Sequence, residues 1–324
     1  MREETALVSI VIPTYNRPNH VILTLKSVLA QTYSNLEVIV QDNASELDLT
    51  ATIAELGDGR VRYFRNERNL GATRNFALGL GHATGEFVGL LADDDLIDPQ
   101  FVERLVSPLV THPDAVVSFC NFWIIDETDT VNSAKTESLG RYFGMHVIPE
   151  GYHADCEVFA LEYRAIGIVS GALLRRSAAD WAGIPADISV HVSDLYHMYL
   201  AARTRKGCCY VPERLTYISH SASTLTTHFT ATLQGKIVSA REHLLYWTMI
   251  HRDGRLTNRR YYHLKRAHYA ALLVFYLLRT GLWAQASAEA LAAMKAGLFL
   301  PRSAVEHIAY LMDIRHAGLQ RKLP

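Results

Sequence analysis

A β-branched segment near the N-terminus constrains the fold more than any other feature of this chain. Val8 to Ile12 is apolar except at Ser9, and it stops at Pro13. A short apolar run of this kind is typical of a parallel strand buried on both faces. Apolar residues at helical spacing follow, and strands and helices then alternate. We therefore expect an α/β fold with a doubly wound, Rossmann-like, mostly parallel sheet flanked by helices.

The expected elements follow from apolar periodicity and from local start and stop signals. Asp98 and Pro99 predict a helix start, with the aspartate as N-cap and the proline in the first turn. The segment 126–155 is rich in Thr, Ser, Gly and charge, and we expect a long loop near the site. The expected strands are 8–12, 36–40, 61–64, 87–91, 116–125, 166–174 and 209–217, and the expected helices are 19–32, 49–56, 72–80, 98–110 and 192–202.

The pattern changes to helices alone after about Thr227. We expect an α/β domain over 1–227, with one half at about 1–125 and another at about 126–227. An all-helical C-terminal extension then covers 228–324. Its expected helices are 236–251, 259–279, 284–296 and 301–316.

Charge is unevenly distributed along the chain. The net charge is −1, which argues against nucleic acid as a partner. Residues 255–324 carry +8 and the rest carry −9. Basic residues at 259–266 precede the apolar run Ala270 to Leu278, which is too short to span a bilayer. Two interpretations remain open: peripheral contact with an anionic membrane surface, or packing of the helices on the catalytic domain or in a homodimer.

The N-terminus and the cysteines bear on the compartment. The first residues lack the basic start and apolar stretch of a signal peptide. None of the four cysteines forms a CxxC pair, so we expect free thiols in a reducing compartment. The expected location is cytoplasmic, with the inner face of the membrane as the alternative site of action.

Polar clusters follow three of the expected strands. Thr14 to Arg17 follow the first, Asp42 and Asn43 follow the second, and Asp93 to Asp95 follow the fourth. In open α/β sheets, ligands bind beyond the carboxyl ends of the strands. Three adjacent aspartates repel one another and favour a cation, and all-oxygen ligation suits Mg²⁺ or Mn²⁺. The alternative is an acidic turn stabilised by the dipole of the next helix.

Three segments, VSIVIPTYNRP, EVIVQDNAS and NLGATRNFALGLGHATGEFVGLLADDDLIDP, occur in the order and spacing that resemble the family 2 glycosyltransferases. The resemblance covers roughly residues 7–225. It implies a GT-A fold, a nucleotide-diphosphate sugar donor, an acidic metal-binding motif of the Asp-x-Asp type and an inverting reaction.

The resemblance also implies roles for individual residues. Asp94 and Asp95 would hold the metal that meets the diphosphate, and His220 is a further candidate metal ligand. The half at about 1–125 would bind the donor and the half at about 126–227 the acceptor. Two positions depart from the family: Gln41 replaces a frequent acid, which leaves the base open between uracil and thymine, and Ala92 replaces another aspartate. The residues expected to bind the nucleotide sugar are Pro13, Thr14, Tyr15, Arg17, Asp42, Asn43, Arg74 and Asp93.

Asp194 lies in a segment that resembles the one that supplies the general base in the family. An inverting transfer needs a base to take the proton of the acceptor hydroxyl. The expected activity is therefore metal-dependent transfer of a sugar from a UDP- or dTDP-sugar to a glycan or lipid-linked acceptor in glycan biosynthesis. Two alternatives remain: a nucleotidyltransferase on a related fold, and a non-catalytic sugar-nucleotide-binding component of a glycan-assembly complex.

Overall fold

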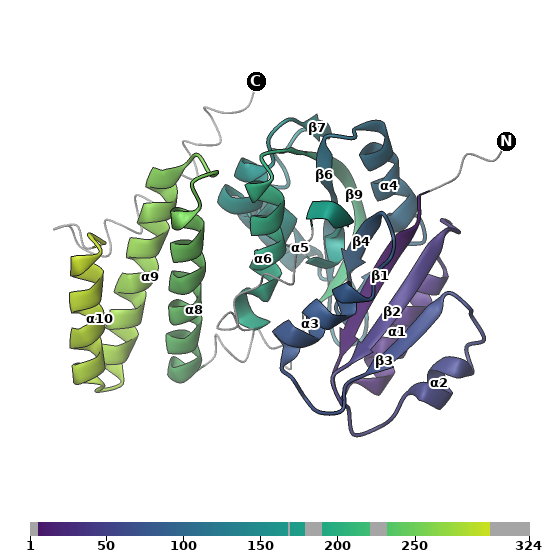
Figure 1. Cartoon of the computed structure of the whole chain (residues 1–324), viewed down its shortest axis with the longest axis horizontal. Helices are drawn as coiled ribbons and strands as arrows, with labels where there is room; N and C mark the ends of the chain where they lie inside the picture. The colour runs from purple at the N-terminus through teal and green to yellow at the C-terminus, as the bar shows by residue number, and fades with distance from the viewer. Residues whose placement is uncertain (1–5, 168, 179–189, 221–231, 299–324) are drawn as a thin grey trace. The chain divides into compact units, whose positions relative to one another are not determined.

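The computed structural model describes residues 6–167, 169–178, 190–220 and 232–298 (Figure 1). The chain forms two compact units, Met1–His220 and Ser221–Pro324.

The first unit is built on one sheet with the strand order β3-β2-β1-β4-β8-β6-β9-β5, in which β7 also pairs with β9. The strands β1 to β4 are parallel to one another, and antiparallel pairing begins where β8 joins β4. The α/β fold class is confirmed, and the sheet is mixed. The strands are β1 (Val8–Thr14), β2 (Leu36–Asp42), β3 (Val61–Arg65), β4 (Phe87–Leu90), β5 (Leu96–Ile97), β6 (Ala115–Ile125), β7 (Gly151–His153), β8 (Ala172–Arg175) and β9 (Gly207–Ser219).

Helices cover both faces of the parallel half. Leu25 and Val28 of α1 share a buried cluster with Ile10, whereas the next residue of β1, Val11, faces Gly79 of α3. Successive side chains of a strand point to opposite faces, so α1 and α3 lie on opposite sides of β1. The helices of this unit are α1 (Pro18–Leu29), α2 (Thr50–Ala54), α3 (Ala72–Gly81), α4 (Phe101–Thr111), α5 (Ser133–Tyr142) and α6 (Val190–Arg203).

The segment expected as a loop at 126–155 contains α5 and β7 instead. Helix α5 is mostly polar, so its periodicity gave little signal. Its stability comes from a cap and a tertiary bond: the Asn132 side chain accepts from the Lys135 N–H, and the buried Thr136 hydroxyl accepts from the Ile124 N–H of β6. Packing context decides the conformation here, as it commonly does for weak helices.

Two further boundaries differ from expectation. Helix α4 begins at Phe101, because the carboxylate of Asp98 accepts from the Gln100 N–H in a preceding turn rather than capping the helix. The strand expected at 166–174 is confined to β8, and short 3₁₀ turns occupy Ala165–Gly167 and Val169–Gly171. The second turn carries Ser170, whose hydrogen bonds belong to the candidate site.

The second unit contains three packed helices in its described part, α8 (Leu233–Arg252), α9 (Arg259–Arg279) and α10 (Trp283–Lys295). Thr232 and Asn258 cap α8 and α9, and apolar residues of all three helices form a small core. The helices expected at 236–251, 259–279 and 284–296 are confirmed, while the one expected at 301–316 lies outside the described residues. No helix in the described part has the length and apolarity needed to cross a membrane.

An exposed apolar tip marks the turn between α9 and α10. We define this apolar tip as Phe275, Leu278, Leu282 and Trp283, of which Trp283 is 65% exposed. A spacing of three residues places Phe275 and Leu278 on one side of the end of α9, and Leu282 and Trp283 follow at the start of α10. Arg279 lies among them, with its guanidinium 5.9 Å from the Phe275 ring centroid.

We predict that Gly79→Ala destabilises the first unit by about 1–3 kcal/mol, the usual cost of overpacking a core. An added Cβ would lie 2.7 Å from Cγ1 of the buried Val11, which sits in a strand and cannot yield easily. Gly81→Ala is the matched control: it lies in the same helix, with no atom within 4 Å of its Cβ position. It should be neutral or stabilising. Urea unfolding of both variants tests this, and equal stabilities would contradict the packing of α3 on β1.

Candidate active site

The candidate site lies where β1 and β4 part. In the sheet, β1 pairs with β2 as far as Thr14 and Asp42, but with β4 only as far as Val11 and Leu90. The chain leaves β1 toward β2 on one side, and it returns through α3 to β4 on the other. Such a reversal of strand order creates a crevice at the carboxyl ends of the strands. The loops after β1 and β4 meet in it.

Asp93 is held in this crevice by residues of the first loop. Its Oδ2 accepts a hydrogen bond of 2.7 Å from the Thr14 hydroxyl, and its Oδ1 lies 3.2 Å from Nη1 of Arg17. Burial and the neighbouring charge of Asp94 raise the pKa of Asp93 to about 6, although Arg17 and Thr14 oppose the rise. This carboxyl therefore carries its charge at neutral pH at an energetic cost, which favours a nearby cation.

Arg17 bridges two of the three aspartates. The same Nη1 that approaches Asp93 lies 2.6 Å from Oδ2 of Asp94. Burial lowers the pKa of Arg17, but the two carboxylates outweigh it and the pKa is raised. The guanidinium therefore remains charged at any physiological pH.

Asp95 faces away from this pair. Its Oδ2 accepts from the Ser170 hydroxyl, and its Oδ1 accepts a bond of 2.8 Å from the Ser219 N–H. The buried Thr24 hydroxyl of α1 lies near the backbone oxygens of Asp93 and Asp95. Asp95 thus ties the loop after β4 to the end of β9 and to the turn before β8. Sequence reasoning missed Ser170 and Ser219, because they join the site only through the tertiary fold.

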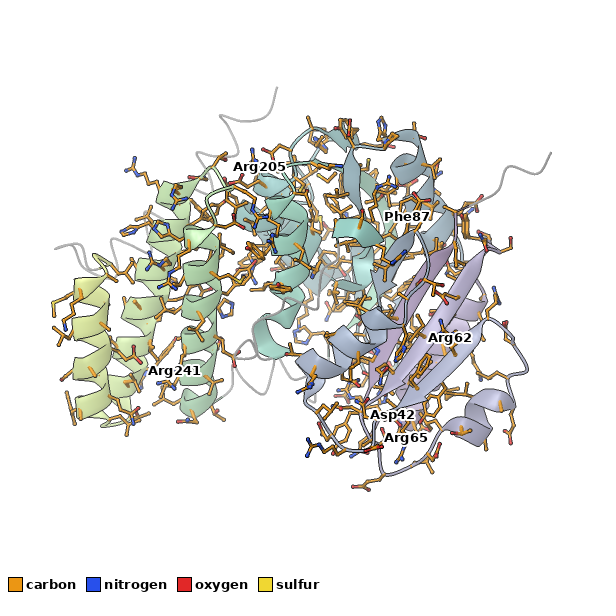
Figure 2. The ribbon with its side chains drawn as sticks, in the orientation of Figure 1. Asp42, Arg62, Arg65, Phe87, Arg205 and Arg241 are labelled. Carbon is orange, nitrogen blue, oxygen red and sulfur yellow. The ribbon has the colours of Figure 1, made fainter. Side chains whose placement is uncertain are left out.

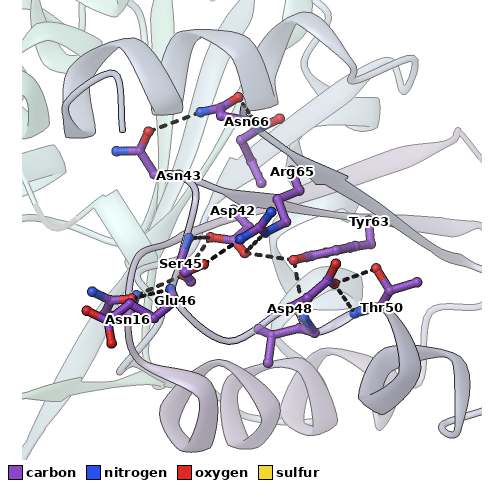
Figure 3. Close-up of polar contacts among 12 residues, drawn as sticks. Asn16, Asp42, Asn43, Ser45, Glu46, Asp48, Thr50, Tyr63, Arg65 and Asn66 are labelled. Atoms are coloured by element: carbon purple, nitrogen blue, oxygen red, sulfur yellow. Dashed lines mark hydrogen bonds and ion pairs between the residues drawn. The ribbon is translucent and has the colours of Figure 1, made fainter. Parts of the chain in front are cut away.

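Asp42 is fully buried at the end of β2. Its carboxylate accepts from the Ser45 N–H at 2.9 Å, from the Ser45 hydroxyl at 2.6 Å and from the Tyr63 hydroxyl at 2.7 Å (Figure 3). Arg65 of β3 lies beside it, with Nε 3.6 Å from Oδ2 (Figure 2). Asn16, at a positive φ of 55°, links the loop after β1 to this turn through Ser45. Both oxygens of Asp42 therefore have protein donors in this structure.

A chain of carboxamides connects β2, β3 and α3. Asn66 accepts from Nε2 of Gln41 at 3.0 Å, and it donates to the carboxamide oxygens of Asn43 at 3.0 Å and Asn75 at 2.8 Å. Asn75 donates to the backbone oxygen of Gln41. The Oε1 of the buried Gln41 has no hydrogen-bond partner among the described residues. The asparagines at 66, 69 and 75 are the feature of the sequence that could have indicated this network. Which side chains they contact could not be inferred from it.

Three other residues expected to contact the donor differ in exposure. Pro13 is buried within β1, Tyr15 is 45% exposed after it, and Arg74 is exposed on the first turn of α3. Their contacts with a nucleotide stay predictions, as do those of Thr14, Arg17, Asp42, Asn43 and Asp93.

Asp194 and His220 come from later elements. Asp194 is the fifth residue of α6 as described, so it is not the helix cap; the placement of its side chain lies outside the described part. His220 is exposed just after β9, and its N–H donates to the Ile125 oxygen. Partial desolvation of its ring and the nearby Lys135 lower the pKa of His220, which favours the neutral imidazole that can bind a cation.

The residues of the crevice fit a divalent cation only in part. Asp94 offers a carboxylate oxygen at the surface of the site, and Asp93 lies beside it. The described residues hold no group of three or more acidic, His or Cys side chains that could bind a metal on their own. Mg²⁺ in phosphate-handling sites typically uses one or two carboxylates and takes its other ligands from water and substrate phosphates. These metal ligands suit a cation that binds together with a diphosphate.

Comparisons with known proteins identify the class of protein. The family model described as glycosyl transferase family 2 matches residues 9–180, just over half of the chain. The chain therefore belongs to the family 2 glycosyltransferases, as the sequence motifs indicated.

Two curated relatives illustrate the similarity. The glycosyltransferase GlyG of Streptococcus pneumoniae is 32% identical over 126 residues, which are 38% of this chain and 41% of GlyG. A UDP-Glc:alpha-D-GlcNAc-diphosphoundecaprenol beta-1,3-glucosyltransferase, WfgD of Escherichia coli, is 30% identical over 125 residues, 39% of this chain and 49% of WfgD. The matched region thus spans less than half the length of either relative.

Solved structures share the fold. TarS of S. aureus, residues 1–349 in complex with UDP-GlcNAc, has a TM-score of 0.58 at 17% identity and covers 86% of this chain and 79% of its own. The mannosyltransferase PcManGT of Pyrobaculum calidifontis, in complex with GDP-Man and Mn²⁺, has a TM-score of 0.57 at 17% identity. The match covers 99% of this chain and 89% of PcManGT. These similarities establish the GT-A fold.

Proposed function

We propose that this protein is an inverting, metal-dependent glycosyltransferase that uses a UDP- or dTDP-sugar. The observation that carries the proposal is the pairing of Asp93 and Asp94 with Thr14 and Arg17, in the crevice where β1 and β4 part. A nucleotide diphosphate needs cationic groups for its phosphates, and this crevice provides an arginine together with carboxylates that suit a divalent ion. In this proposal Thr14, Tyr15 and Asp93 line the nucleoside, with Asp42, Asn43 and Arg74 on the base side.

Asp94 would hold the cation, with the His220 imidazole as a further ligand from the end of β9. A divalent cation bound there would neutralise the charge that develops on the diphosphate leaving group. The sequence also suggested Asp95 as a metal ligand. Because its carboxylate accepts from Ser170 and Ser219, we propose instead that Asp95 positions the loop that carries Asp93 and Asp94. A structural neighbour, PcManGT, was solved with Mn²⁺ and GDP-Man, which supports metal-assisted donor binding here.

Asp194 is proposed as the general base. It would accept the proton of an acceptor hydroxyl as that oxygen attacks the anomeric carbon from the side opposite to the leaving nucleoside diphosphate. Helix α6, which carries it, contacts α3. The acceptor is proposed to be a glycan or a lipid-linked sugar, in line with the diphosphoundecaprenol-linked substrate in the name of WfgD. Family membership favours glycosyl transfer over nucleotidyl transfer and over simple binding.

We also propose that the second unit makes peripheral contact with an anionic membrane. The sequence left this open against packing or dimerisation, and the helices lacked an obvious aromatic face. The apolar tip supplies one: Trp283 and Phe275 are exposed, with Arg279 between them in sequence. Exposed aromatics beside basic residues are typical of surfaces that lie in the membrane interface. Such contact would bring the enzyme to a lipid-linked acceptor.

The first prediction concerns the metal. With Mn²⁺, UDP or dTDP should raise the melting temperature, and EDTA should abolish most of that shift. Asp94→Asn should weaken metal-dependent nucleotide binding by roughly tenfold or more, by analogy with the cost of perturbing metal-site residues. Asp114→Asn, an exposed aspartate just before β6, is the control and should bind normally. Equal affinity for all nucleotides with and without metal would contradict the proposal.

The second prediction concerns the base. Asp194→Asn should keep donor and metal binding but lower sugar transfer by roughly a hundredfold or more, because no base then takes the proton of the attacking hydroxyl. Binding is measured by calorimetry and transfer by release of the nucleoside diphosphate. Transfer at the wild-type rate would place the base elsewhere.

The third prediction concerns the membrane. The protein should co-sediment with vesicles containing anionic lipid, less so at higher salt, and not with neutral vesicles. Trp283→Ala should weaken this binding by roughly tenfold, since burying a large apolar side chain is worth about 1.5–3 kcal/mol. Tyr142→Ala, which removes an exposed aromatic from α5 outside the apolar tip, is the control. Failure to sediment at low salt would favour packing or dimerisation, which analytical ultracentrifugation would then resolve.

A further inference from the structure

Arg17 is placed to move without disturbing the fold. It precedes α1, and its backbone oxygen accepts from the Val21 N–H at 3.1 Å, so its main chain is fixed by the first turn of the helix. Its side chain is 27% exposed, more than the side chains of Asp93 at 12% and Asp94 at 15%. The guanidinium therefore covers the two carboxylates from the solvent side and can leave them by side-chain rotation alone.

Arg17 and the proposed metal would bind the same carboxylate, that of Asp94. Oδ2 of Asp94 is the atom that Arg17 contacts at 2.6 Å, and Asp94 is also the carboxylate proposed to bind the metal. A guanidinium and a divalent ion repel each other strongly at such a separation in a partly buried site. Arg17 cannot relieve the repulsion by losing its proton. The described residues show no other basic side chain paired with Asp93 or Asp94.

We infer that Arg17 is a built-in counter-cation that occupies Asp94 while the donor is absent and must leave it when the divalent ion binds. The inference rests on the proposed function. Once displaced, the guanidinium is available for the donor's diphosphate oxygens, which arginine binds well. When the metal binds alone, Arg17 loses its pairing with Asp94. When the metal and the diphosphate bind together, the diphosphate gives Arg17 a new partner. The two ligands should consequently strengthen each other's binding, by the same factor in each direction.

The test measures Mn²⁺ binding without any turnover. Mn²⁺ affinity is determined by titration calorimetry, alone and with saturating UDP, for the wild type, Arg17→Gln and Arg17→Lys. In the wild type, UDP should tighten Mn²⁺ binding by roughly tenfold or more, within the usual range of coupling between sites. In Arg17→Gln, Mn²⁺ alone should bind about tenfold more tightly than in the wild type, and the tightening by UDP should shrink. Arg17→Lys, which keeps the charge, should fall between them.

Controls separate this role from a general change in charge or stability. Lys26→Gln removes one positive charge from the exposed side of the same helix and should leave Mn²⁺ binding unchanged. Melting curves without ligand show whether each variant folds, and Mn²⁺ alone should raise the melting temperature of Arg17→Gln more than that of the wild type.

Two results overturn the inference. If Arg17→Gln binds Mn²⁺ alone no more tightly than the wild type, or if UDP tightens Mn²⁺ equally in both, Arg17 does not compete for Asp94 and the proposed function stands. If the wild type binds neither Mn²⁺ nor any nucleoside diphosphate, the proposed function fails together with the inference.

Discussion

Asp93 and Asp94 follow β4 into a crevice that leaves Asp93 9% exposed, and carboxylates so placed need hydrogen bonds or a cation. Thr14 and Arg17, from the loop after β1, supply both. The remaining contacts of the loop after β4 serve this pairing. Thr24 holds its backbone, and Asp95 anchors it to the turn before β8 and to the end of β9. Residues next to β8 and β9, in the mixed half of the sheet, thus hold the loop that carries Asp93 and Asp94.

A second set of bonds connects the neighbouring loops. The buried Asp42 gathers Ser45, Tyr63 and Arg65 around the end of β2, and the carboxamides of Gln41, Asn66 and Asn75 join that strand to β3 and α3. The close approach of α3 at Gly79 fixes the helix on the same strands. A site that must hold a flexible diphosphate gains from such preorganisation, because less ordering remains for the moment of binding.

The match to the family model lies within the first unit. The curated relatives match 37–40% of the chain in the longest alignments, and the family model ends at residue 180. The three described helices of the second unit lie beyond that match. Their exposed apolar tip and their positive charge set them apart from the acidic catalytic unit, which is consistent with a different partner for each unit.

The alternation of apolar strands and helices was sufficient to predict β1, α1, β2, β3, α3 and β4, because each is specified by local periodicity. It also put Thr14, Arg17, Asp93 and Asp94 at one sheet edge, since parallel strands end together. Sequence patterns did not predict α5 or the short β5, whose stability depends on contacts such as Thr136 with Ile124 and the pairing of β5 with β9. They assigned roles to the three aspartates by resemblance but did not predict which side chains each would contact.

Only the tertiary structure gave each of those aspartates its partners. It turned Asp95 toward Ser170 and Ser219, buried Asp93 against Thr14, and left Asp94 to Arg17. The sequence by itself determined the family, the parallel half of the sheet and the residues gathered at its edge, because these depend on short-range pattern. Which oxygen meets which donor depends on residues as far as 124 positions apart, and only the folded chain brings such residues within hydrogen-bonding distance.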